Sequence, residues 1–174
     1  QLKVGDVSIG KALFYADHPY NTAYDLVIAH GFAGVSSLTI IAEGHAPGVF
    51  REVAALDALE QFQRYMERTS AMAGGSVSGV DIIRQLYQMF EEGIPKWAIL
   101  PTDSHDVSNM FSYFLMSAGA PTLDRLVDKN LQNATITIFF HDYSHDTIMG
   151  ALQRAQDYIV AHPMEKMDFR LAGG

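Results

Sequence analysis

The stretch ATITIFFHDYSHDTIMGALQRAQDYIVAHPMEKMDFRL, residues 134–171, predicts a strand, a helix and a second strand in direct succession. Residues 134–141 alternate in the way that is typical of a strand with one buried face. The helix predicted over 144–161 begins with the capping residue Ser144, carries apolar residues on one face and stops before a proline. Residues 166–171 follow as the closing strand. This half of the chain is therefore expected to form a β-α-β unit.

The residues upstream predict a similar succession. LTIIA at 38–42 is a short β-branched run between glycines and is expected to be a strand. Apolar residues at helical spacing predict a helix over 51–68. Residues 71–79 are small and are expected to be flexible, residues 123–127 to be a strand or a short helix, and residues 22–30 to be a short helix. The order of strand, helix and weak strand, then strand, helix and strand, indicates an α+β, ferredoxin-like split β-α-β fold.

Between these two halves the sequence predicts an inserted helical hairpin. Helices are expected over 81–92 and 104–118, joined by an apolar loop over 94–101 that prolines bracket. The second helix is apolar around most of its circumference, and such a helix must bury both sides or meet a ligand or a membrane. Its apolar residues include Met110, Phe111, Tyr113, Phe114, Leu115 and Met116.

The composition restricts both the fold and the partners. With 174 residues, 48% of them apolar, the chain is long enough for one domain with a buried interior. We expect a single domain over 1–174, with a core of about 36–80 and 120–174 and the insertion at about 81–119. A net charge of −8 argues against nucleic acid and against binding to anionic head groups by charge alone. No apolar run approaches the roughly 18 residues that span a bilayer. Without cysteine the chain has no disulfide framework and no thiolate metal site.

The segment GGSVSG at 74–79 has some likeness to the nucleophile elbow of hydrolases. That motif is G-x-S-x-G with serine in the middle, and Val77 occupies the middle position here. A flexible turn is the preferred interpretation, and no catalytic residue is expected. A serine hydrolase remains the alternative, and labelling of Ser76 or Ser78 by a fluorophosphonate probe would favour it.

The segment HDYSHD at 141–146 concentrates four potential metal ligands. His141 and His145 are four residues apart, but one is expected to end a strand and the other to lie in a helix, so the two side chains should diverge. Asp142 or Ser144 is instead expected to cap the helix. We expect no metal and no cofactor.

Several segments resemble, in the same order, parts of a known transporter domain. They are DHPYN at 17–21, FAG at 32–34, the run 59–66, a segment from SVSGVDII at Ser76 to QMFEEGIPK, and RLAGG at 170–174. Together they cover most of the chain. They resemble the periplasmic porter domain of resistance-nodulation-division (RND) exporters, in the hydrophobe and amphiphile exporter branch related to hopanoid and mycobacterial lipid transporters.

The resemblance implies a domain on the periplasmic side of the bacterial inner membrane that collects or passes a hydrophobic cargo such as a sterol or hopanoid. In that family, proton-motive force acts on carboxylates of a transmembrane bundle, which this chain does not contain. The implied partners are the lipid cargo, the transmembrane part of the same protein, and sister subunits or periplasmic lipid carriers. The abrupt start at Gln1 and the glycine pair at 173–174 are expected for a piece of a longer chain.

The inserted hairpin and its loop are expected to line a cargo cleft. Methionine and aromatic side chains suit an adaptable apolar cleft. Burying about 300 Å² of a sterol at roughly 25 cal/mol/Å² gives several kcal/mol before association costs, enough for micromolar capture. Tyr87 or Trp97 can hydrogen-bond a lipid hydroxyl. The predicted ligand-binding residues are Tyr87, Phe90, Trp97, Met110, Phe111, Tyr113 and Phe114.

Two alternatives to the cleft remain open. The same residues can pack on one another or on a sister subunit, which would make the domain an assembly module without a ligand. A free-standing periplasmic binding protein is the other alternative.

Overall fold

The computed structural model describes residues 36–70, 72–117, 125–142 and 144–172, together with positions 18, 19, 22, 23, 26 and 34. The helix predicted over 22–30 and the first two residues of the segment 123–127 lie largely outside these residues. Within that segment, Val127 forms an isolated antiparallel bridge with Ala134.

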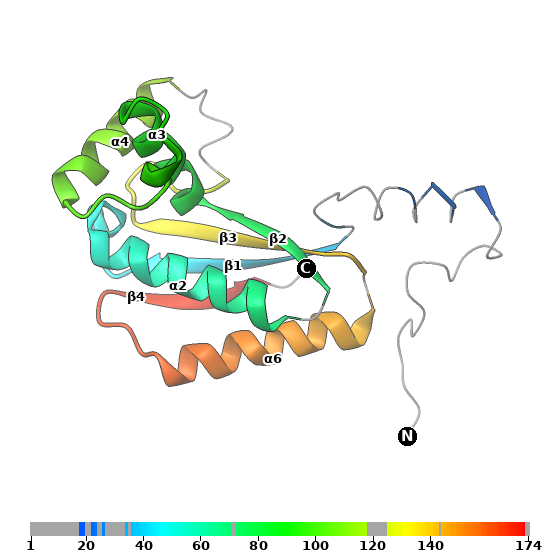
Figure 1. The fold of residues 1–174 in the computed structure, drawn as a ribbon. Helices are drawn as coiled ribbons and strands as arrows, with labels where there is room; N and C mark the ends of the chain where they lie inside the picture. The colour runs from blue at the N-terminus through cyan, green and yellow to red at the C-terminus, as the bar shows by residue number, and fades with distance from the viewer. Residues whose placement is uncertain are drawn as a thin grey trace.

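Four strands among the described residues form one antiparallel sheet, shown in Figure 1. The strands are β1 (Ser36–Gly44), β2 (Ala73–Ser78), β3 (Asn133–Phe140) and β4 (Met167–Ala172), and their order in the sheet is β2-β3-β1-β4. Helix α2 (Val53–Thr69) connects β1 to β2, and helix α6 (His145–Ala161) connects β3 to β4. Each β-α-β unit is therefore split by a strand of the other unit, and the molecule is an α+β protein.

Alternation along the central strands builds the core. Leu38, Ile40 and Ala42 of β1 are buried, as are the equivalent apolar residues of β3, because successive side chains point to opposite faces of a sheet. Both helices pack on this face. The ring of Phe62 on α2 contacts Tyr158 of α6 at 5.1 Å and stacks on Phe169 of β4 at 4.4 Å, measured between ring centroids.

The regular elements of the two halves agree with the sequence-based expectation to within a few residues. The predicted helix over 51–68 is α2, preceded by the 3-10 turn η1 (Val49–Arg51). The predicted cap at Ser144 is confirmed, because its hydroxyl accepts a hydrogen bond from the Thr147 backbone N–H at 3.2 Å.

The prediction that residues 71–79 are flexible is wrong. They contain β2, which pairs with β3 from Ala73 to Ser78 and forms one edge of the sheet. A register shift interrupts the pairing between Ala73 and Gly75, where the glycine has a φ of +147° that favours glycine. Because its residues are small, this strand could not be recognised from the sequence pattern. It is stabilised by cross-strand pairing and not by the strand propensity of its own residues.

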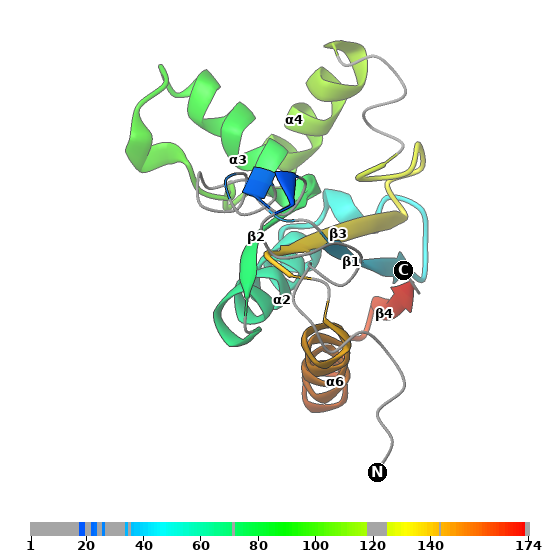
Figure 2. The same cartoon turned by 90° about the vertical axis from the view of Figure 1, so that its right-hand side faces the viewer.

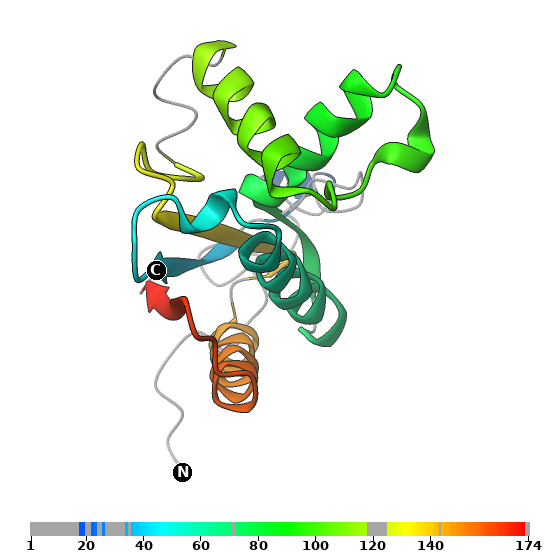
Figure 3. The same cartoon turned by 90° about the vertical axis from the view of Figure 1, so that its left-hand side faces the viewer.

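Two further helices, α3 (Gly79–Phe90) and α4 (Ser104–Ser117), occur between β2 and β3, with the 3-10 turn η2 (Pro95–Trp97) in the connection. We call residues 79–117 the α3–α4 insertion. It lies on the β2–β3 side of the sheet, whereas α6 lies on the β4 side (Figure 2). Its two helices leave the sheet in a similar direction and diverge (Figure 3), so the insertion differs from the antiparallel hairpin that we expected.

The long connection between α3 and α4 explains this direction. It returns towards the sheet beside α3, and there Arg84 donates from Nε to the backbone oxygen of Ala98 at 2.9 Å.

In the described part of the chain, no helix combines the length and hydropathy needed to cross a membrane.

Candidate functional site

The structure divides the seven predicted ligand-binding residues between the core and the surface. In the middle of α4, Met110 and Phe111 are buried in the core, and Phe111 is only 1% exposed. Phe114 is partly buried and packs against the same core. These three residues therefore stabilise the attachment of α4 to the domain, and Met110 and Phe111 do not offer an open surface to a cargo.

The end of α3 and one face of α4 are exposed. Phe90 at the end of α3 and Tyr113 on α4 meet edge-to-face, with ring centroids 5.0 Å apart. Met89 precedes Phe90, Met116 follows Tyr113 by three residues, and Met116 is 88% exposed. We call these four residues, Met89, Phe90, Tyr113 and Met116, the outer apolar surface.

We call the connection between α3 and α4, residues 91–103, the return loop. The two remaining predicted residues form a second aromatic pair between α3 and this loop. Tyr87 of α3 and Trp97 of η2 are partly buried, and their rings meet edge-to-face at 5.9 Å between centroids. The Lys96 ammonium lies 5.0 Å from the centre of the Trp97 ring, a cation–π distance. Ile94 and Ile99 on either side of this pair are exposed. Both isoleucines belong to the apolar loop predicted over 94–101, but they were not among the predicted ligand-binding residues.

An arginine bridge ties this loop to the rest of the domain. Besides its bond to Ala98, Arg84 places its guanidinium 3.4 Å from the carboxylate of Glu60 on α2. Glu60 also pairs with Arg64 one helical turn further along, at 2.6 Å. The aromatic pair is thus connected through one side chain to α2, which packs on the sheet.

The base of the insertion is fixed by a closed set of polar contacts. The Ser78 hydroxyl donates to Gln63 Oε1 at 2.6 Å and accepts from the Val80 backbone N–H at 3.2 Å. Gln63 Nε2 and the Ser78 backbone N–H both donate to Asp81 Oδ2 at 2.9 Å. Ser78 is fully buried and Asp81 is partly buried, and this capping box joins β2, α2 and α3.

This geometry assigns structural tasks to both serines of the GGSVSG segment. Ser78 is the N-cap of α3, and Ser76 donates to Glu67 at 2.5 Å.

Residues of the HDYSHD segment form hydrogen bonds at the start of helix α6. Asp142 is 3% exposed and accepts hydrogen bonds from the hydroxyls of Ser144 and Thr147, each at 3.1 Å, while its backbone oxygen accepts from Ser36. Its other carboxylate oxygen has no partner among the described residues. The described residues contain no group of three or more ligating side chains that could hold a metal ion.

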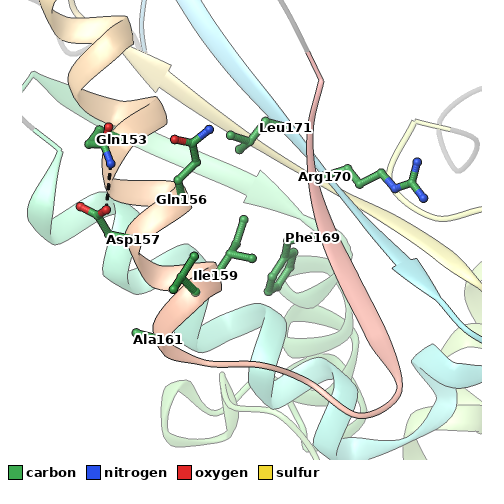
Figure 4. Close-up of a pocket in the computed structure, with 9 residues that line it drawn as sticks. Gln153, Gln156, Asp157, Ile159, Ala161, Phe169, Arg170 and Leu171 are labelled. Atoms are coloured by element: carbon green, nitrogen blue, oxygen red, sulfur yellow. Dashed lines mark hydrogen bonds between the residues drawn. The ribbon is translucent and has the colours of Figure 1, made fainter.

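Cavities among the described residues lie away from the α3–α4 insertion. One of about 870 Å³ is an open groove between α6 and β4 (Figure 4). A cavity of about 280 Å³ lies beside His45, and one of about 260 Å³ lies between the start of α2 and the loop before β4. In the insertion, the large apolar residues that remain exposed are those of the outer apolar surface and the isoleucines Ile94 and Ile99.

No family model matches the chain, and no curated protein or solved structure matches it either.

Proposed function

We propose that this chain is the periplasmic porter domain of an RND-type transporter, with a ferredoxin-like fold, and that its α3–α4 insertion receives a hydrophobic cargo such as a sterol or hopanoid. The proposal is supported by the ordered motifs in the sequence. It is also supported by the strand order β2-β3-β1-β4 with its two split β-α-β units. Helices α3 and α4 follow β2 and precede β3, and so lie between the two units in the chain.

The outer apolar surface is the observation that carries the cargo proposal. Exposed side chains of this size are unfavourable in water, and fully burying one such side chain stabilises by about 1.5–3 kcal/mol. Covering Met89, Phe90, Tyr113 and Met116 together therefore gives several kcal/mol before the costs of association. That is compatible with reversible, micromolar capture of a lipid.

The return loop supplies the polar contacts that an amphiphile needs. The indole N–H of Trp97 and the hydroxyl of Tyr87 are the hydrogen-bonding groups of the aromatic pair, and Lys96 adds a cation beside it. We assign the apolar body of the cargo to the outer apolar surface and its polar group to this pair.

The solvent exposure of the outer apolar surface also supports a second function. Met116 is 88% exposed, and Met110 and Phe111, which were expected to enclose a cargo, belong to the core. An exposed apolar surface of this kind also fits an assembly module that docks on a sister subunit or a periplasmic lipid carrier.

Lipid retention by a surface variant separates these functions. The chain is incubated with bacterial membrane lipid extract, repurified and analysed by native mass spectrometry. The test variant carries Phe90→Ser, Tyr113→Ser and Met116→Ser, all at exposed positions, so that the core is left intact. A matched control carries Met149→Ser, an exposed methionine of α6 on another part of the molecule.

The cargo function predicts that the wild type and the Met149→Ser control retain lipid and that the triple variant does not. Equal retention by a folded triple variant would refute it. If the wild type retains no lipid, but the triple variant loses binding to another subunit of the transporter, the assembly function is supported instead.

A further inference from the structure

Among the described residues, strand β4 forms an edge of the sheet, and the direction of its outer backbone groups follows from its pairing with β1. The His45 N–H donates to the Lys166 oxygen at 2.9 Å, one step beyond the pair Gly44–Met167. Bonded and non-bonded pairs alternate in an antiparallel ladder. Asp168 and Arg170 therefore direct their backbone groups towards β1. Met167, Phe169 and Leu171 direct theirs outward.

A second bond confirms this assignment independently. The N–H of Gly44 donates to the Gln132 oxygen at 2.8 Å, on the β3 side of β1. Neighbouring residues of a strand alternate in the direction of their backbone groups. Odd-numbered residues of β1 therefore bond to β4, as the His45 bond requires. The outer edge of β4 is thus a row of N–H and C=O groups ready to pair with another strand.

The side chains of β4 make this edge complementary to a second copy of itself. We propose that two copies of the chain associate through their β4 strands, antiparallel and centred on Phe169, to give one continuous sheet. In this register Met167 faces Leu171 of the second copy, and Phe169 faces Phe169. These are the residues whose backbone groups point outward, so three pairs exchange two hydrogen bonds each.

Charge selects the register. With Phe169 at the centre, Asp168 lies opposite Arg170 of the second copy, and the same pair recurs on the other side of the twofold axis. Opposite charges facing each other across strands stabilise the pairing, and like charges destabilise it. Centring the pairing on Asp168 or on Arg170 instead would place identical charges face to face.

Existing contacts within each copy extend this pattern. Arg170 pairs with Glu43 at 2.8 Å, and Asp168 pairs with His45 at 2.9 Å. In the associated form the charged groups of each row would follow the order Glu43, Arg170, then Asp168 and His45 of the second copy. Such a row alternates in sign when the histidine is protonated.

The groove beside β4 provides the apolar part of the interface. It is lined by Ile159 and Val160 of α6 and by Phe169 and Leu171 of β4 (Figure 4), and Val160 is 82% exposed. A twofold axis perpendicular to the sheet places both α6 helices on the same face. The groove of each copy would then be covered by α6 of the other copy.

Charge reversal provides a direct test in the 174-residue chain. Asp168→Arg gives a chain with arginine at both positions, and Arg170→Asp gives a chain with aspartate at both. Each variant should self-associate at least about tenfold more weakly than the wild type, because two attractive pairs become repulsive. Mixed together, the two variants should form a heterodimer, since each arginine then faces an aspartate. The double variant Asp168→Arg/Arg170→Asp should self-associate again.

Sedimentation velocity over a range of protein concentrations measures these associations, and circular dichroism verifies the fold of each variant. Leu171→Pro is a further variant, because it removes an outward N–H that the pairing with β1 does not use. It should weaken association with little change in the circular dichroism spectrum. A wild type that stays monomeric at millimolar concentration overturns the proposal. So does a dimer that is insensitive to charge reversal, or a mixture of the two variants that remains monomeric.

Discussion

Ser78→Ala tests whether the polar contacts at the base of the α3–α4 insertion hold the domain together. The substitution removes the N-cap of α3 and leaves Gln63 Oε1 buried without its donor. Loss of an N-cap costs about 0.5–2 kcal/mol, and a buried unsatisfied oxygen costs about 1–3 kcal/mol. The free energy of unfolding should therefore fall by about 2–4 kcal/mol, which for a domain of this size lowers the melting temperature by roughly 5–15 °C.

Urea unfolding followed by circular dichroism measures this loss, and Ser76→Ala is the matched control. Ser76 lies two residues earlier, and its hydroxyl bonds to the exposed Glu67. Its removal should change the free energy of unfolding by no more than about 0.5 kcal/mol. The reasoning is refuted if Ser78→Ala unfolds at the same urea concentration as the wild type, or if the control loses as much stability as the test variant.

Three further predictions concern other parts of the molecule. Phe111→Ala should cost about 3–5 kcal/mol in urea unfolding because it opens a cavity in the core, whereas Tyr113→Ala on the exposed face of the same helix should cost about 1 kcal/mol or less; equal losses would contradict the burial. The hydrogen bond to Asp168 raises the pKa of His45 above its usual 6.5, so the stability from this pair is present below pH 6.5 and is lost as the pH rises through the raised pKa. His45→Gln should therefore unfold more easily than the wild type in acid but equally at pH 8, and a difference that grows with pH would disprove the linkage. Arg84→Met should release the return loop, so that acrylamide quenches the single tryptophan, Trp97, more strongly; unchanged quenching would show that the tie to Ala98 does not position the loop.

The strands and helices that carry a clear periodic pattern could be predicted from the sequence. β1, β3 and β4 alternate in burial, and α2 and α6 carry apolar residues at helical spacing, so their positions agree to within a few residues. β2 could not be found in this way. Its sequence AGGSVS has neither bulky residues nor alternation, and only its pairing with β3 makes it a strand.

The candidate site could be located only in part. Apolar spacing identified α4 correctly, but α4 carries apolar residues around most of its circumference. Its buried and partly buried residues recur at helical spacing on one face; they are Val107, Met110, Phe111, Phe114 and Leu115. Tyr113 and Met116 lie on the exposed face. Which of two apolar faces packs on the domain depends on tertiary contacts, which the sequence pattern does not contain.

The buried serine at the junction of β2, α2 and α3 has a mechanical consequence. Helix α3 is anchored at its start by the capping box and held again half-way along by Arg84, so we expect it to move with the domain and not as a separate flap. A hydrophobic molecule bound at its outer end would then need no closing movement to bind or to dissociate. Its residence time would be governed by the area that it covers, and a displacement of α2 would move the outer end of α3 with it.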